Sequence, residues 1–177
     1  MQKIMAVSTK WQLSPLEYKI DFIVAPMLFG IAVWLSPSPS LLQIFLGALI
    51  WSFLEYAAHR FLFHRHFRRD HWAHHVDPAA YIGISGIYLG IAYAALLLPA
   101  WWMGLQSFYA GFMLGYFLYV LMHFVIHRPE HKLYRLLEGV ARNHEMHHLR
   151  GLETNFGVTS PLWDLIFLSY SRPGARP

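Results

Sequence analysis

The sequence contains no cysteine and few charged residues. The absence of cysteine excludes disulfide bonds, thiolate zinc sites and any iron–sulfur cluster held within this chain. Charged residues make up 14% of the chain and hydrophobic residues 56%, whereas a typical soluble protein is about 25% charged. This composition predicts an integral membrane protein. The net charge of +4 then indicates contact with anionic lipid headgroups, and nucleic acid is not expected as a partner.

Four apolar stretches predict an all-α, multi-pass membrane protein with about four transmembrane helices, built as a single domain over residues 1–177. The predicted membrane helices cover about residues 15–35, 41–63, 81–98 and 106–126. Pro99 is expected to end the third of them. The second is apolar only over residues 41–54, which is short for a span of about 20 residues. Either this helix continues to His64, or the first helical hairpin enters the bilayer only partway.

The basic residues predict the orientation of the chain. Three lie in residues 1–19, four in 60–69 and seven in 128–176, whereas the linkers 36–40 and 99–107 have none. Under the positive-inside rule, both termini therefore face the cytoplasm, in a bacterial inner membrane or in the endoplasmic reticulum. Residues 64–80 and 127–170 are expected to form a cytosolic, histidine-rich helical cap.

Ten of the twelve histidines follow a repeated spacing at this cytoplasmic face. Each half of the chain has a histidine pair followed by a triplet. Positions i, i+3 and i+4 share a helical face, so the members of each triplet should converge, as should His123 and His127. His59 and His64 are five residues apart, which is about 140° on a regular helix. These two therefore serve different metal ions, or the helix loosens between them.

Ten imidazoles are too many for one metal ion, since an octahedral ion takes at most six ligands. Two ions with about five histidines each are therefore predicted. Imidazole binds iron, zinc and copper alike, so the ligand type does not identify the metal. His66 and His131 lie outside the pattern and are interpreted as interfacial or structural residues.

At these residues the chain resembles the fatty acid hydroxylase superfamily, which includes sphingolipid fatty acyl hydroxylases, sterol desaturases and carotenoid hydroxylases. The resemblance covers roughly residues 41–170. It rests on HRFLFH at 59–64, HWAHH at 71–75, HFVIH at 123–127, HEMHH at 144–148 and NFGVTSPLWDLIF at 155–167. Two of these motifs, HRFLFH and GVTSPLWD, are most similar to the fatty acid 2-hydroxylase branch.

The resemblance implies a centre of two iron ions held only by histidines, in which zinc can replace iron in the purified protein. The implied metal ligands are His59, His64, His71, His74, His75, His123, His127, His144, His147 and His148. Asn155, Trp163 and Asp164 lie in the last motif. A supporting role beside the ligands is expected for them, because ligating histidines usually donate their other ring nitrogen to a carboxylate or carbonyl.

The predicted function is that of an O₂-dependent hydroxylase acting on a C–H bond of a membrane lipid or fatty acyl chain. The 19 leading residues are too few for a cytochrome b5 domain, so an external cytochrome b5-type or ferredoxin-type protein is expected to supply electrons. A desaturase or carotenoid hydroxylase of the same superfamily is an alternative. A zinc-binding membrane protein or metal transporter is another, but a transporter should place its ligands near the bilayer midplane rather than at one face.

Overall fold

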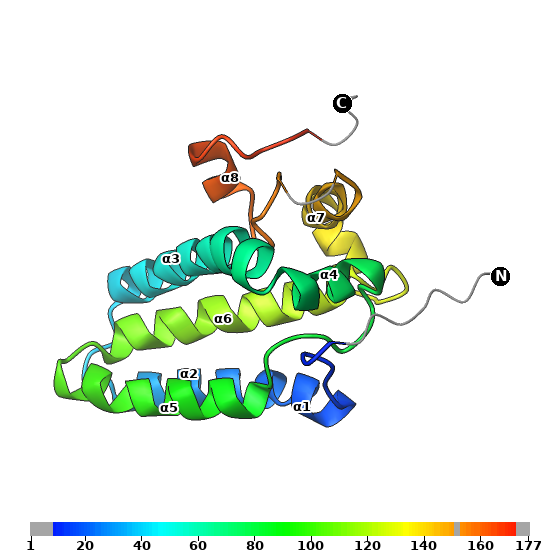
Figure 1. Cartoon of the computed structure of the whole chain (residues 1–177). Coiled ribbons are helices and arrows are strands. Elements are labelled where there is room, and N and C mark those ends of the chain that lie inside the picture. Colours follow the sequence, from blue (N-terminus) through cyan, green and yellow to red (C-terminus); the bar gives the residue numbers. More distant parts are fainter. Residues whose placement is uncertain (1–8, 151–152, 173–177) are drawn as a thin grey trace.

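The computed structural model describes residues 9–150 and 153–172, and its regular elements are helices (Figure 1). Within these residues, β structure is limited to one isolated bridge between Gln12 and Ile82. The elements are α1 (Pro15–Lys19), α2 (Asp21–Leu35), α3 (Leu41–Ala57), the π-helix η1 (Ala58–His66), α4 (Arg68–Val76), α5 (Gly86–Trp102), α6 (Gln106–Ile126), the 3₁₀ helix η2 (Tyr134–Leu137), α7 (Glu138–Arg150) and α8 (Leu162–Ile166).

Three apolar helical segments are long enough to cross a membrane, and a fourth is shorter. The three are Pro15–Leu35, Leu41–His66 and Gln106–Ile126. The fourth is α5, whose 17 residues are at the lower limit for a span. Large apolar side chains on the outer faces are exposed, including Trp34 at 82%. Such an apolar surface is suited to contact with the hydrocarbon core of a lipid bilayer. The second segment has 26 residues and continues past His64, which agrees with the full-length alternative for this helix.

Helix α6 lies at the centre of the molecule. It packs against α3 on one side and against α2 and α5 on the other, as Figure 1 shows. The core between α2 and α6 contains Ala25, Leu28 and Met113. Helices α4 and α7 lie near one end of this bundle, and α8 lies over α3. The cap elements therefore attach to the bundle mainly through α3 with η1 and through α6.

Glycines let α3 and α6 approach each other closely. A Cβ atom added at Gly111 would overlap the backbone carbonyl oxygen of Ile44, and one added at Gly47 would overlap that of Phe108. The close approach fixes the position of α3 relative to α6. The π-helix η1 continues α3 and carries His59 and His64, and α6 carries His123 near its end. The α3–α6 contact therefore also fixes how these candidate ligands meet.

We expect Gly111→Ala to destabilise the protein by about 1–3 kcal/mol, because backbone atoms cannot move aside as a flexible side chain can. Thermal unfolding of the purified protein in detergent measures the effect. Gly30→Ala is the matched control, since a Cβ atom at Gly30 meets nothing within 4 Å and alanine has the better helix propensity. Equal stability of the two variants would contradict this interpretation of the α3–α6 contact.

The predicted helix over residues 81–98 is wrong at both ends, because α5 begins at Gly86 and ends at Trp102. Residues 81–83 instead pair with the N-terminal segment. The N–H of Leu13 donates to the carbonyl of Tyr81 at 2.8 Å, and that of Gly83 donates to the carbonyl of Trp11 at 3.0 Å. Pro99 lies inside the last turns of α5. It removes one backbone donor, and the helix continues for one more turn before it ends.

Candidate metal centre

The π-helix η1 accounts for the five-residue spacing between His59 and His64. Backbone hydrogen bonds in a π-helix join residues five apart, as the N–H of Phe67 does with the carbonyl of Leu62 at 3.0 Å. Residues five apart then face nearly the same way. The rings of His59 and His64 lie 4.9 Å apart between centroids. Of the two alternatives for this pair, the structure shows the loosened helix.

Five histidines from three parts of the chain form cluster 1, with one nitrogen of each lying within 4.8 Å of the others. Cluster 1 consists of His59, His64, His71, His75 and His147. The Nε2 atom of His71 lies 3.0 Å from that of His59 and 3.0 Å from that of His75. The Nε2 atom of His64 lies 3.1 Å from that of His147. The ring nitrogens therefore converge on one point.

Cluster 2 lies beside cluster 1 and consists of His74, His127, His144 and His148. The Nε2 atom of His144 lies 3.2 Å from that of His127 and 3.1 Å from that of His148. His123 adjoins this group, with its Nε2 atom 3.3 Å from that of His127. The stacked rings of His75 and His148, 4.2 Å apart, join the two clusters.

Each histidine triplet is divided between the clusters. His71 and His75 belong to cluster 1 and His74 to cluster 2, while His147 belongs to cluster 1 and its neighbours in the triplet to cluster 2. The helical face brings the three rings of a triplet to the same region, as predicted. The two clusters lie so close together that one face supplies ligands to both.

The spacing of the nitrogens fits bound metal ions. Nitrogens that bind one ion at about 2.1 Å are separated by about 3.0 Å at right angles and about 3.4 Å in a tetrahedron. The observed Nε2 separations of 3.0–3.3 Å lie in this range. The Nε2 atom of His74 is buried and has no hydrogen-bond partner within the described part of the chain. A metal ion would satisfy this nitrogen.

Burial keeps these imidazoles neutral, which is the form that binds metal. Loss of solvation, with the neighbouring histidines as a further cause, lowers the pKa of His71, His74 and His144 well below the usual value. Burial likewise lowers the pKa of His75 to about 3 and that of His127 to about 2.

Two backbone carbonyls of the C-terminal segment orient two rings of cluster 1. The Nδ1 atom of His59 lies 2.6 Å from the carbonyl oxygen of Phe156, and that of His147 lies 2.7 Å from the carbonyl oxygen of Thr154. A carbonyl only accepts hydrogen bonds, so Nδ1 carries the proton in both rings. The lone pair of each neutral ring is therefore on Nε2, which faces the cluster.

The candidate supporting residues Asn155 and Asp164 hold this segment in place, and their hydrogen bonds within the described part of the chain go to groups other than histidine rings. Asp164 is fully buried and accepts hydrogen bonds from the N–H groups of Phe156 and Gly157, each at 2.8 Å. Asn155 has a positive φ of 56°, and its side chain donates to the carbonyl of Asn143 at 3.2 Å. Trp163 donates to the hydroxyl of Ser52, which attaches α8 to α3.

Glu55 is a supporting residue that the sequence analysis missed. It is buried in α3, one turn before His59, and it accepts hydrogen bonds from the N–H groups of Val158 at 2.6 Å and Thr159 at 3.0 Å. The Thr159 hydroxyl also donates to it, at 2.6 Å. The signal was present, because a carboxylate in an apolar membrane helix is usually functional.

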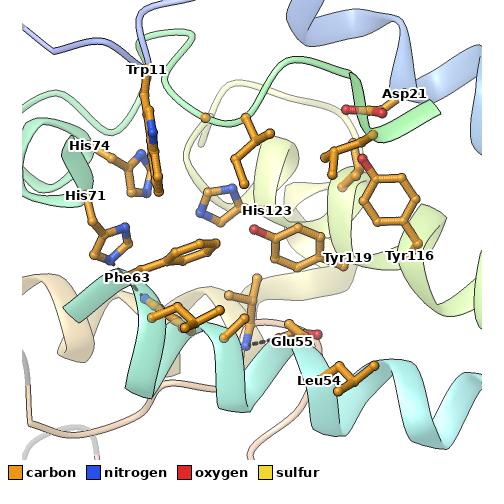
Figure 2. A pocket seen from close by; sticks show the side chains of 18 of the residues that line it. Trp11, Asp21, Leu54, Glu55, Phe63, His71, His74, Tyr116, Tyr119 and His123 are labelled. Carbon is orange, nitrogen blue, oxygen red and sulfur yellow. Dashed lines mark hydrogen bonds between the residues drawn. The ribbon is translucent and has the colours of Figure 1, made fainter. Parts of the chain in front are cut away.

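An apolar cavity of about 570 Å³ reaches the metal centre. His71, His74 and His123 line one part of it, and Trp11 from the N-terminal segment covers this part, as Figure 2 shows. Leu54 and Leu62 on α3 and η1, and Ile84 on the segment before α5, also line the cavity and are 43%, 46% and 42% exposed. The cavity therefore opens between α3 with η1 and the segment that precedes α5, where the outer surface is apolar.

His66 and His131 lie apart from both clusters, as expected. His66 is exposed, and its Nδ1 atom lies 3.2 Å from the carbonyl oxygen of Phe61. His131 accepts a hydrogen bond from the N–H of Leu133. Both side chains therefore interact with nearby backbone.

Comparison with known proteins identifies related sequences and a related structure. A family profile described as fatty acid hydroxylase matches residues 44–169. A dihydroceramide fatty acyl 2-hydroxylase of Arabidopsis thaliana is 29% identical over 142 residues, which are 70% of this chain and 58% of that protein. The fatty acid 2-hydroxylase of Homo sapiens is 30% identical over 158 residues, which are 78% of this chain and 41% of that protein.

The solved structure of full-length scs7p, in which only the hydroxylase domain is visible, is similar with a TM-score of 0.65 and 27% identity. The similarity covers 96% of this chain and 70% of that one. The chain spans less than two thirds of the length of the curated relatives named above, at 58% and 41%.

Proposed function

Since this chain belongs to the fatty acid hydroxylase family, we propose that it is a di-iron hydroxylase that uses O₂ to insert oxygen into a C–H bond of a membrane lipid or fatty acyl chain. The observation that carries this proposal is the cavity lined by His71, His74 and His123. This cavity is apolar, opens at the apolar outer surface and ends at the convergent imidazole rings. The curated relatives described above are named as a dihydroceramide fatty acyl 2-hydroxylase and a fatty acid 2-hydroxylase, which supports an acyl chain as the substrate.

We propose that cluster 1 and cluster 2 each hold one iron ion, with His123 as the fifth ligand of the second. When bound, iron supplies the activation of O₂ that an unactivated C–H bond requires. The donor set supports two ions, since it contains ten neutral nitrogens and no carboxylate among the clustered residues. Zinc is expected to occupy the same sites in protein purified without added iron.

The residues of this chain position the substrate and protect the site. Apolar and aromatic walls hold the acyl chain and exclude water, which prevents side reactions. Trp11 packs against Phe63 with ring centroids 5.3 Å apart and closes the cytoplasmic side of the cavity. The carbonyls of Thr154 and Phe156 keep the protons of His147 and His59 on Nδ1, so that both Nε2 lone pairs remain directed at cluster 1.

We further propose a membrane topology and a class of electron donor for this chain. The whole chain, residues 1–177, acts as one integral-membrane domain with both termini and the metal centre in the cytoplasm, at a bacterial inner membrane or the endoplasmic reticulum. The distribution of basic residues supports this orientation. The chain has no cysteine for an iron–sulfur cluster, which supports an external cytochrome b5-type or ferredoxin-type electron donor.

Mass spectrometry of lipids from cells that express the protein tests this function. We expect a lipid class that gains one oxygen atom in an acyl chain, and labelling with ¹⁸O₂ should place the label in that product. A His144→Ala variant, expressed to the same level, should give no product. A lipid that loses two hydrogens would show desaturation instead. Unchanged lipids, together with stable binding of zinc and no turnover after iron loading, would favour a metal-binding role.

A further inference from the structure

The cavity has a second polar region, away from the histidines. Figure 2 shows His71 and His74 at one end, and Asp21 and Tyr116 at the other. The walls between them are mostly apolar, with Tyr119 in the middle. Hydrogen-bonding groups so isolated in an apolar binding cavity usually determine the orientation and identity of the ligand.

Asp21 is 6% exposed, and its carboxyl group is incompletely paired. Its Oδ1 atom is enclosed and has no hydrogen-bond partner among the described residues. The Tyr116 side chain interacts with the same carboxyl group. A buried carboxylate oxygen without a partner is costly and uncommon in a folded protein. Oδ1 can therefore accept a hydrogen bond from a ligand in the cavity.

Packing against α5 accounts for the surroundings of only one of the two carboxyl oxygens of Asp21. A Cβ atom added at Gly86, the first residue of α5, would lie 2.8 Å from Oδ2 of Asp21. This places Oδ2 beside a helix N-terminus, where a negative charge is stabilised. The contact holds the carboxyl group in position and leaves Oδ1 as the acceptor that remains available.

A donor without a partner lies in the same part of the cavity. The indole Nε1 of Trp51 is buried and unpaired in the described structure. The Trp51 ring packs against that of Tyr116 with centroids 4.9 Å apart, and both residues line the cavity. This part of the cavity therefore has an acceptor on Asp21 and a donor on Trp51, and a hydroxyl group can both donate and accept.

We propose that Asp21 forms a recognition site for a hydroxyl group carried by the lipid that enters this cavity. This inference rests on the proposed function, because it takes the cavity to be the substrate site. The hydroxyl donates to Oδ1 of Asp21, while the carbon chain extends toward His71 and His74. The distance between the two ends of the cavity then determines which carbon lies beside the metal centre.

Binding of two matched probes tests the inference without any turnover. The full chain, loaded with zinc in phosphatidylcholine nanodiscs, is titrated with 1-dodecanol and with methyl dodecyl ether, and tryptophan fluorescence is followed because Trp11 and Trp51 line the cavity. The ether keeps the acceptor oxygen and lacks the donor. We expect wild-type protein to bind the alcohol about tenfold more tightly, after correction for partition into empty nanodiscs.

Substitutions of Asp21 decide whether this preference depends on the carboxyl group. Asp21→Ala should bind both probes equally. The isosteric Asp21→Asn, which keeps the packing against Gly86, should reduce the preference to about threefold, because a neutral acceptor is weaker than a charged one. Asp77→Asn is the matched control, since Asp77 is exposed and does not line the cavity; it should keep the full preference.

Two results would overturn the inference: wild-type protein that does not distinguish the probes, or Asp21→Ala and Asp21→Asn variants that both keep the wild-type preference. If Asp21→Ala does not fold, the Asp21→Asn titration decides alone. The assay needs neither iron nor O₂. A failure of the proposed hydroxylation, seen as unchanged lipids in cells, is therefore separate from a failure of hydroxyl recognition.

Discussion

Replacing His147 by alanine is expected to remove the metal ion from cluster 1 and to lower product formation by more than about 100-fold. Loss of a residue that only hydrogen-bonds to a metal ligand typically costs about 10–100-fold in metal affinity or activity, and loss of the ligand itself should cost more. His147 is fully buried, its Nε2 atom lies 3.1 Å from that of His64, and its Nδ1 atom is held by the carbonyl of Thr154. Metal analysis of the purified variant should find one ion per chain in place of two, and lipid analysis should find no product.

His66→Ala is the matched control for this prediction. His66 lies in the same histidine-rich stretch, but it is exposed and interacts only with the backbone carbonyl of Phe61 among the contacts that the structure describes. We expect this variant to keep both metal ions and most of the activity. If His66→Ala lost as much activity as His147→Ala, the proposed set of ligands would be wrong.

Replacing Asp164 by alanine is expected to lower the free energy of unfolding by roughly 3–5 kcal/mol and to weaken metal binding at cluster 1 by about 10–100-fold. The substitution removes the acceptor for the buried N–H groups of Phe156 and Gly157 and for the hydroxyl of Ser169. The carbonyl of Phe156 then no longer holds the ring of His59. Thermal unfolding and competition with a metal chelator measure the two effects separately.

The Asp164→Ala substitution is expected to weaken metal binding at cluster 1 and not at cluster 2. The segment that Asp164 holds contacts His59 and His147, which both belong to cluster 1. The metal ion of cluster 2 should therefore be retained at chelator concentrations that remove the first. Glu138→Ala is the control, because its ion pair with Arg142 is on the surface and contributes little to stability. Equal loss of both ions in the Asp164 variant would contradict this role.

Helix positions were largely predictable from the sequence, because hydrocarbon requires long apolar runs with satisfied backbone hydrogen bonds. The predicted range 106–126 agrees with α6. The range 81–98 was displaced because residues 81–83 pair with the segment around Trp11. That pairing joins segments about 70 residues apart, and no local pattern in either segment indicates it.

The supporting residues were predictable only in part. Asp164 and Asn155 were expected to act beside the metal ligands. In the structure they hold a backbone segment in place, and carbonyls of that segment contact His59 and His147. Backbone carbonyls are present at every residue, so the sequence cannot indicate which of them accept from a histidine. Glu55 and Asp21 could have been noticed as isolated carboxylates in apolar helices.

The sequence by itself determined the number and spacing of the ten clustered histidines and their common end of the helical bundle, because helical periodicity and the length of apolar runs act locally. Only the tertiary structure decided which cluster each histidine joins: His71, His75 and His147 belong to cluster 1, and His74, His144 and His148 belong to cluster 2. It also decided that η1 winds as a π-helix, so that His59 and His64 join one cluster. Both outcomes depend on the packing of α3, α4, α6 and α7 around a shared centre, where the position of each ring is set by elements distant in the sequence.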